Sequence, residues 1–207
     1  MKKYSSYLLA ALAVISVLVF SFKTENLQDY KAKTSVNSFD ADAYARNLYD
    51  NELSACVEKA PDAATFLQEF TADKSAALDK YGRRLGISST SYLMLKGQGV
   101  IEAVESEYVV VTLPDNSKVL LATDFIFGNA VRDGSGKVDI SGFVNMTNFN
   151  AVTVAINHIL KAEVVEPFRK QALVGRHVAF AGAAELRVKD ELAQGLRLIP
   201  VEATLSN

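Results

Sequence analysis

The chain has 207 residues, with 22 basic and 24 acidic side chains, two histidines, one cysteine and no tryptophan. A single cysteine excludes a disulfide within the chain, and two histidines far apart in the sequence argue against a metal site. A net charge of −2, with no basic run longer than Arg83-Arg84, argues against a nucleic-acid partner. We therefore expect neither cofactor, metal nor nucleic acid.

The N-terminal residues indicate membrane targeting. Lys2 and Lys3 precede a weakly polar to apolar run over residues 5–22, at the short end of the roughly 20 residues that span a bilayer. The run is typical of a signal sequence, and we expect an uncleaved signal anchor because bulky aromatic residues flank the small ones that a cleavage site needs. A cleaved signal peptide and a buried helix of the domain are the alternatives. The flanking lysines predict a cytoplasmic N-terminus, a single-pass transmembrane helix in the inner membrane, a tether over residues 23–38 and a periplasmic or external domain.

Two amphipathic helices are predicted after the tether. Apolar side chains recur at helical spacing over residues 40–60, and Pro61 ends the helix because the residue before proline avoids helical geometry. The second helix ends at Gly82 and breaks near Ala72-Asp73. Cys56 lies on the first apolar stripe, where we expect a small buried side chain; a reactive thiol or an intermolecular disulfide is the functional alternative.

Short runs rich in Val, Leu, Tyr and Phe then predict strands, over residues 92–96, 100–104, 108–113 and 118–127. Gly97 and Gly99 separate the first two runs, and we expect them to mark a bulge or bend within one long strand. The Pro-Asp-Asn-Ser sequence over residues 114–117 is typical of a turn.

A glycine-rich insertion follows over residues 128–147, in which Asp133–Gly136 predicts a turn and residues 138–143 predict one more short strand. Asn148 is expected to cap a long helix that Pro167 bends or ends. Two final strands are predicted over residues 176–183 and 196–204, and Pro200 indicates that the last strand lies at a sheet edge.

The order of elements predicts an α+β fold in which an N-terminal anchor helix and two amphipathic helices precede an OB-like, partly open β-barrel with one long helix between strands. Both amphipathic helices are expected over one open end of the barrel. We expect one extracytoplasmic domain over residues 39–205, with a helical part at 39–84 and a barrel part at 91–204. A plain α+β sheet with helices on one face is the alternative.

Four charged residues are candidate ligand-binding residues. Arg132 ranks first and is followed by Asp133, because the insertion is expected near the barrel mouth, where a buried Arg–Asp pair would line a pocket. Arg83 and Arg84 could bind an anionic ligand through paired hydrogen bonds. The structural alternatives are a local turn-stabilising pair for Arg132-Asp133 and solvated cations at a helix end for the other two. No catalytic constellation is present: His158 and His177 have no recognisable partner, and Gly-x-Ser-x-Gly does not occur.

An ordered series of short motifs resembles one bacterial family. The motifs are Lys80-Tyr81-Gly82-Arg83-Arg84, Leu95-Lys96-Gly97-Gln98-Gly99-Val100, Asn129-Ala130-Val131-Arg132-Asp133, residues 148–157 and Leu173-Val174-Gly175-Arg176. Together they resemble the domain of unknown function 2291, whose members are described as predicted periplasmic lipoproteins. The resemblance covers residues 39–203 and implies a membrane-attached, extracytoplasmic protein encoded beside sugar-type ABC transporters. This chain departs from the pattern because no cysteine follows its apolar run, so it has no lipobox.

Three functions are consistent with these observations. The first is a non-enzymatic, membrane-anchored accessory protein of a small-solute ABC uptake system, whose partner is the transporter permease or the solute-binding protein. The second is a direct small-ligand-binding protein that uses the barrel mouth and the arginines. The third is a hydrolytic enzyme, which the scarcity of histidines and the lack of a nucleophile motif disfavour.

Overall fold

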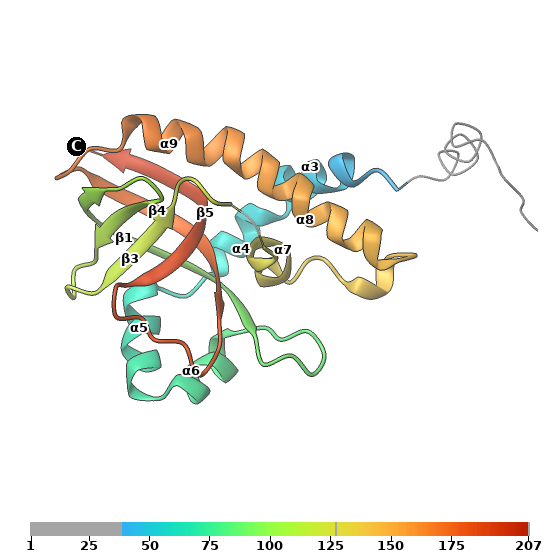
Figure 1. Cartoon of the computed structure of the whole chain (residues 1–207), viewed down its shortest axis with the longest axis horizontal. Helices are drawn as coiled ribbons and strands as arrows, with labels where there is room; N and C mark the ends of the chain where they lie inside the picture. The colour runs from blue at the N-terminus through green and yellow to red at the C-terminus, as the bar shows by residue number, and fades with distance from the viewer. Residues whose placement is uncertain (1–38, 127, 207) are drawn as a thin grey trace, which may run out of the picture. The chain divides into compact units, whose positions relative to one another are not determined.

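Five strands close into a barrel in the order β1-β2-β3-β5-β4 (Figure 1). The computed structural model describes residues 39–126 and 128–206, so the expected anchor and tether lie outside the described residues. The strands are β1 (Ser91–Val104), β2 (Tyr108–Thr112), β3 (Lys118–Ala122), β4 (His177–Leu186) and β5 (Leu196–Ser206). Neighbours pair antiparallel except β3 and β5, which pair in parallel. The predicted OB-like barrel is confirmed, although the predicted opening is wrong because β1 pairs with β4 and completes the ring.

The helices lie before, between and beside these strands. They are α3 (Ala41–Asn51), α4 (Leu53–Lys59), α5 (Ala63–Ala72), α6 (Lys74–Tyr81), α7 (Ala130–Ser135), the 3-10 turn η1 (Ile140–Gly142), α8 (Met146–Leu160), the π-helical turn η2 (Lys161–Val165) and α9 (Glu166–Gln171). Within residues 39–126 and 128–206, no helix has the length and apolar character needed to cross a membrane.

Strand β1 pairs with two neighbouring strands, β4 and β2, because its glycines let it bend. Its residues from Ser91 to Val100 pair with β4, and those from Val100 to Val104 pair with β2. A Cβ atom at Gly99 would overlap the Thr112 carbonyl oxygen, so only glycine fits where the two strands converge. The prediction of one long strand is confirmed, and a register shift follows immediately, between Ile101 and Ala103.

Pro200 does not mark a sheet edge, and that prediction is wrong. It lies on β5, which pairs with β3 over Leu196–Leu198 and with β4 on the other side, so the strand is not at an edge even though the β3 pairing ends before Pro200. The β4–β5 register shifts between Ala181 and Gly182, and Gly182 is the residue opposite Pro200. Because a bulge disrupts the hydrogen-bond ladder locally, a proline without an N–H group can be accommodated there.

The inside of the barrel is filled by apolar side chains, and α5 and α6 extend this core through Phe66, Phe70 and Leu78. Asp73 separates these two helices as predicted, since its side chain caps α6 by accepting from the Ala76 N–H group. Phe168 of α9 belongs to the same core.

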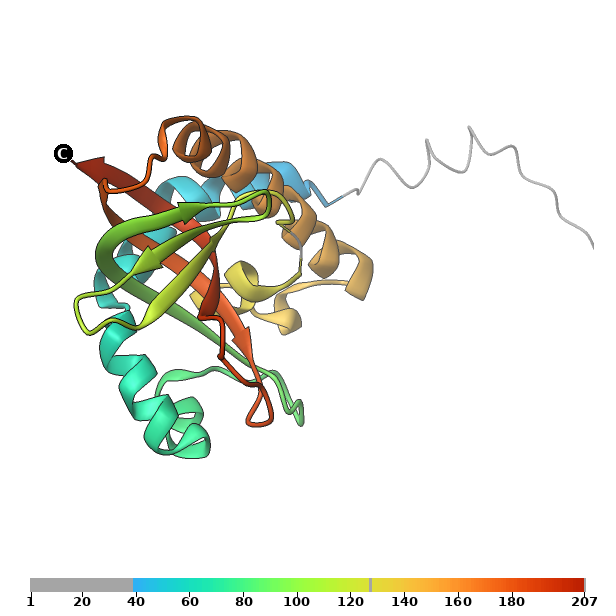
Figure 2. The ribbon, with the colours of Figure 1, turned by 60° about the vertical axis from the view of Figure 1, so that its left-hand side comes forward.

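The expectation that both N-terminal helices cover one barrel end is correct only for α5 and α6. The first helix divides at Glu52 into α3 and α4, and its apolar stripe, including Leu48, packs with Phe149 and Ile156 of α8 in a second core. The outward-facing side chains of Tyr92 and Met94 complete this second core. Figure 2 shows α3 and α8 side by side outside the barrel wall.

The insertion contains helices where a turn and a strand are predicted. Residues 130–135 form α7, and residues 140–142 form η1 instead of a strand. A Cβ atom at Gly134 would lie 3.2 Å from the Leu93 carbonyl oxygen, so this glycine lets α7 lie directly on β1. Within the predicted turn Asp133–Gly136, Gly136 has the left-handed conformation, with φ of 63°, and it ends the helix.

The long helix between the strands is confirmed, with different limits. Its N-cap is Asn145, not Asn148, since the Asn145 side chain accepts from the Asn148 N–H group at 2.8 Å. Pro167 does not end the helix. The wider π turn η2 lies just before it, and the altered hydrogen-bond pattern of that turn compensates for the N–H group that proline lacks. Strand β3 also ends earlier than predicted, at Ala122.

Candidate functional site

Arg132 and Asp133 form an ion pair inside the protein. Arg132 Nε donates to Asp133 Oδ1 at 2.6 Å and Nη2 donates to Oδ2 at 3.0 Å, while the two side chains are 2% and 1% exposed. Arg132 Nη1 donates to the Phe149 carbonyl and to Asn150 Oδ1. The guanidinium carbon lies 3.6 Å from the centroid of the Phe149 ring. The pair therefore joins α7 to α8 under the surface, and most of its hydrogen-bonding capacity is used within the protein.

The two consecutive arginines after α6 diverge. Arg84 Nη2 lies 2.8 Å from Asp79 Oδ1, and Arg84 Nε donates to Ser91 Oγ at 3.1 Å. The backbone N–H and carbonyl groups of Arg83 both pair with the Tyr92 backbone, which aligns this segment with β1. Successive side chains along an extended segment point in opposite directions, so those of Arg83 and Arg84 diverge. Of the four predicted residues, Arg83 lines the cleft described next.

This cleft, called the cationic cleft below, lies where α4, α6 and α7 end beside β1. It encloses about 550 Å³, within the range of small-molecule sites. Its lining includes four cations, one thiol and one thioether, and contains no carboxylate: Lys59, Lys80, Arg83, Lys137, Cys56 and Met94. Sequence reasoning missed Lys59, Lys80 and Lys137, whose one local signal is a position at or just after a helix end.

Gly136 makes room for Arg83. A Cβ atom at Gly136 would collide with the Arg83 guanidinium group, and the φ of 63° would strain any other residue. Residues 83 and 136 lie on segments far apart in the sequence, so the glycine that ends α7 also positions the guanidinium group in the cleft.

The cations of the cleft differ in their partners. Lys80 Nζ lies 2.8 Å from Glu69 Oε2, and Lys137 Nζ lies 3.8 Å from Glu52 Oε2. Among the described residues, no carboxylate and no hydrogen-bond acceptor pairs with the side chain of Lys59 or Arg83. These two side chains are the groups best able to receive an anion.

Helix ends moderate the positive charge. Three helices direct their carboxyl ends at the cleft, each with a partial negative charge of at most about half a unit. Two carboxylates offset Lys80 and Lys137, and the helix ends offset most of the remaining two charges. A small positive excess is left, so the cleft as a whole still attracts an anion.

Cys56 lies at the inner side of the cleft. Its sulfur lies 3.3 Å from the Glu52 carbonyl oxygen and 3.4 Å from the Ser135 carbonyl oxygen. Burial raises the pKa of the Cys56 thiol, and the nearby Lys137 ammonium group acts in the opposite direction. The prediction of a small buried side chain is only partly correct, since Cys56 is half-buried.

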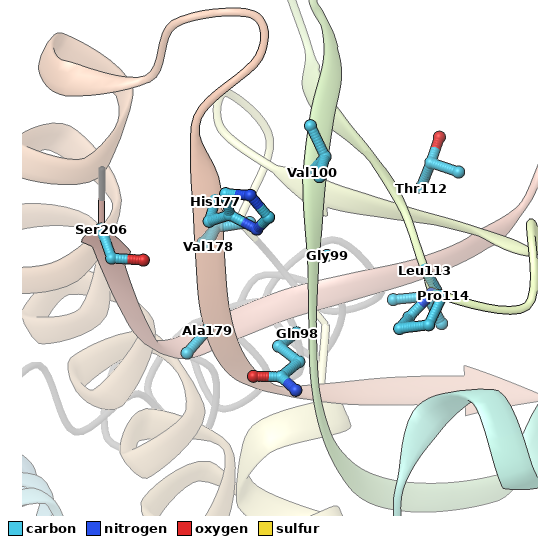
Figure 3. Close-up of a pocket in the computed structure, with 10 residues that line it drawn as sticks. All are labelled: Gln98, Gly99, Val100, Thr112, Leu113, Pro114, His177, Val178, Ala179 and Ser206. Carbon is cyan, nitrogen blue, oxygen red and sulfur yellow. The ribbon is translucent and has the colours of Figure 1, made fainter.

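A second hollow lies on the barrel wall where β1 leaves β4 for β2 (Figure 3). It encloses about 490 Å³, and its polar side chains are neutral or weakly basic: Gln98, Thr112, His177 and Ser206. His177 faces outward, while its neighbour Val178 points into the core. Because no formal charge or carboxylate faces His177 across this hollow, the cationic cleft offers the stronger basis for recognition.

No group of three or more His, Cys, Asp or Glu side chains among residues 39–126 and 128–206 could hold a metal ion. His158 and His177 lie on separate elements, α8 and β4, and both are exposed.

Comparison with known proteins gives a family and a fold. The sequence profile of a family described as predicted periplasmic lipoprotein (DUF2291) matches residues 10–204. A crystal structure of an OB-fold protein from Thermotoga maritima is similar with a TM-score of 0.75 and 26% sequence identity, and the match covers 82% of this chain and 100% of that one. The comparison with curated proteins gave no match.

Proposed function

The chain belongs to the DUF2291 family of predicted periplasmic lipoproteins, and on that premise we propose that it is a membrane-attached, non-enzymatic protein whose extracytoplasmic domain binds a small organic anion in the cationic cleft. Cys56 lies within α4, and residues 1–55 contain no cysteine that could carry a lipid. The apolar run over residues 5–22 is the proposed means of attachment.

The proposal rests on two cations in one cleft whose side chains have no ion-pair or hydrogen-bond partner among the described residues. Lys59 and Arg83 approach from the ends of α4 and α6, and no carboxylate lines the space between them. A guanidinium group binds a carboxylate or a phosphoryl group through two parallel hydrogen bonds, which the ammonium group of a lysine cannot do. Arg83 is therefore the principal anion contact and Lys59 the supporting charge.

The size and the walls of the cleft limit the ligand. Met94 and Ala60 supply buried apolar surface beside the cations. A molecule with one carboxylate or phosphoryl group and a short uncharged body, such as a sugar acid or a sugar phosphate, satisfies both parts of the lining. A neutral sugar leaves Arg83 and Lys59 without a counter-charge.

Thermal unfolding of the full-length protein in detergent tests the proposal. The probes are gluconate, glucose 6-phosphate, inorganic phosphate, glucose and adenosine. A ligand present at 100 times its dissociation constant stabilises the folded state by about 2.7 kcal/mol. We expect a rise in Tm with at least one of the two organic anions and none with glucose or adenosine.

Neighbouring arginines supply the matched control. Arg83→Ala and Lys59→Ala are expected to remove the rise in Tm, whereas Arg84→Ala, which changes an arginine that pairs with Asp79 outside the cleft, is expected to retain it. A flat response to every anion, or a response that Arg83→Ala leaves intact, would contradict binding in the cationic cleft.

We also propose that this binding serves a small-solute uptake system, with the protein as an accessory to an ABC transporter permease or its solute-binding protein. Support comes from the family resemblance and its association with sugar-type transporters. In-membrane crosslinking of the full-length protein, followed by mass spectrometry, is expected to capture transporter subunits. Unchanged solute uptake after deletion of the gene would argue against this role.

A further inference from the structure

The segment from η1 to the start of α8 exposes large apolar side chains. Val144 is 94% exposed, Met146 is 53% exposed and Ile140 is 45% exposed. We call these three side chains the apolar tip. Exposed apolar residues that gather in one segment indicate a contact surface more than isolated ones do.

The apolar tip is held by buried and capped neighbours. The Phe143 ring lies 5.4 Å from the Tyr44 ring and 5.3 Å from the Phe149 ring, measured between centroids. Asp139 caps η1 through Ser141, and Asn145 caps α8 through Asn148. Since both sides of the tip are fixed, its exposure is built into the fold.

The surface around the apolar tip carries few charges. Residues 140–157 contain no Asp, Glu, Lys or Arg, although such residues form 22% of the chain. The exposed Val154 continues the uncharged surface along α8. Asp139 directly precedes the tip in the sequence, and Asp40 and Asp42 precede Tyr44; all three are acidic and exposed, and the Asp40 and Asp139 carboxylates already accept backbone N–H groups. The cation before Asp139, Lys137, lies near Glu52 and lines the cationic cleft.

The tip lies at the end of the domain where the polypeptide enters. Tyr44, which contacts Phe143, belongs to the first turns of α3, and α3 is the first helix of the domain. Figures 1 and 2 both show the start of α3 and the loop before α8 at the same end of the domain. A chain attached to a membrane through residues 5–22 would therefore enter the domain beside this tip, and a linker of about sixteen residues can reach at most several tens of ångströms, at about 3.3–3.6 Å per residue.

We propose that the apolar tip inserts into the outer surface of the membrane to which the protein is attached, and so orients the domain on the bilayer. The occupant is an uncharged or zwitterionic lipid surface, because the acidic neighbours disfavour anionic headgroups. The inference rests on the membrane attachment proposed above but not on ligand binding in the cationic cleft.

Tryptophan fluorescence tests this contact, since the chain contains no tryptophan of its own. Val144→Trp is introduced into the full-length protein, which is reconstituted into phosphatidylcholine vesicles with or without brominated acyl chains. The control is Val174→Trp. Val174 is also exposed, at 66%, but it follows α9, at the other end of the continuous helix that α8, η2 and α9 form. We expect Val144→Trp to show a blue-shifted spectrum and quenching by the brominated chains, and Val174→Trp to show neither.

Three outcomes would overturn the proposal. Without quenching of Val144→Trp, or with equal quenching of both variants, the tip does not contact lipid selectively. A blue shift that occurs only in native membranes, and not in lipid vesicles, would assign the tip to a protein partner instead. Stronger quenching after addition of phosphatidylglycerol would contradict the preference for uncharged headgroups. Anion-induced changes in Tm report on the cleft separately, so failure of one proposal does not imply failure of the other.

Discussion

Arg132 and Asp133 are adjacent in the sequence and bind each other through two hydrogen bonds in the protein interior. Both residues lie within the short helix α7, where consecutive side chains normally point in different directions, so a direct contact between them is unusual. The Phe149 ring and the Asn150 side chain then enclose the guanidinium group from α8. The pair thereby fixes the insertion between barrel and helices.

Removal of one member of this pair is expected to destabilise the protein strongly. Asp133→Asn leaves a buried guanidinium group without its counter-charge, and we expect the free energy of unfolding to fall by about 3–5 kcal/mol. Urea unfolding followed by circular dichroism measures the change. As a control, Lys118→Met breaks the exposed pair with Glu102 and is expected to cost at most about 1 kcal/mol. Similar losses of unfolding free energy in the two variants would show that the buried pair contributes no more to stability than the exposed pair does.

Gly99 is expected to tolerate no side chain. A Cβ atom there would overlap the Thr112 carbonyl oxygen and approach Val111 Cγ1 at 2.8 Å. Gly99→Ala should therefore separate β1 from β2 and lower the free energy of unfolding by about 1–3 kcal/mol. Gly142→Ala is the matched control, because a Cβ atom at Gly142 meets nothing within 4 Å. Equal unfolding midpoints for the two variants would be inconsistent with the described β1–β2 approach.

Gly136→Ala tests how the cationic cleft is assembled. The added methyl group would displace the Arg83 guanidinium group without removing any charge. We expect anion affinity to fall about as far as in Arg83→Ala, together with a stability loss of about 1–2 kcal/mol from the left-handed backbone. Titration of the same anions by calorimetry separates these effects. Retention of full affinity in Gly136→Ala would show that the position of Arg83 does not matter.

Cys56 reports on occupancy of the cleft. Since burial raises its pKa, less thiolate is present at neutral pH than for a free cysteine, and alkylation by iodoacetamide should be slow near pH 7 and faster toward pH 10. Lys137→Ala removes a charge that lowers the pKa and should slow the reaction further at each pH. A bound anion should protect the thiol. Mass spectrometry of the alkylated protein gives the rates, and native Cys56 reacting faster than the unfolded chain near pH 7 would contradict the raised pKa.

Much of the barrel could be predicted because its signals are local. Alternating apolar residues predict β2, β4 and β5 close to their true limits, and Gly97 with Gly99 predicts that β1 is one bent strand. The order of strands around the long helix α8 then indicates the OB-type topology. Ser206 and Leu186 extend the last two strands beyond their predicted ends, since strand ends depend on pairing with neighbours.

The misleading signals were also local. Asp133–Gly136 is typical of a turn, yet Gly134 belongs to a helix because only a residue without a side chain lets α7 lie on β1. Pro200 is typical of an edge strand, yet β5 lies within a closed sheet, where Pro200 is accommodated opposite Gly182 at a bulge and beyond the residues that pair with β3. At Gly134 a contact with a distant segment overrides the preference of the residue, and at Pro200 the pairing of the rest of the strand does so.

The sequence by itself determined the order of elements, the family and the charged candidates, because apolar periodicity and short motifs act over a few neighbouring residues. Only the tertiary structure decided which candidates meet. It buried Arg132 with Asp133, sent Arg84 toward Asp79, and gathered Arg83 with Lys59, Lys137 and Cys56. The physical reason is that the cleft forms from three helix ends that only the packing of α4, α6 and α7 around β1 brings together, and no local pattern encodes that packing.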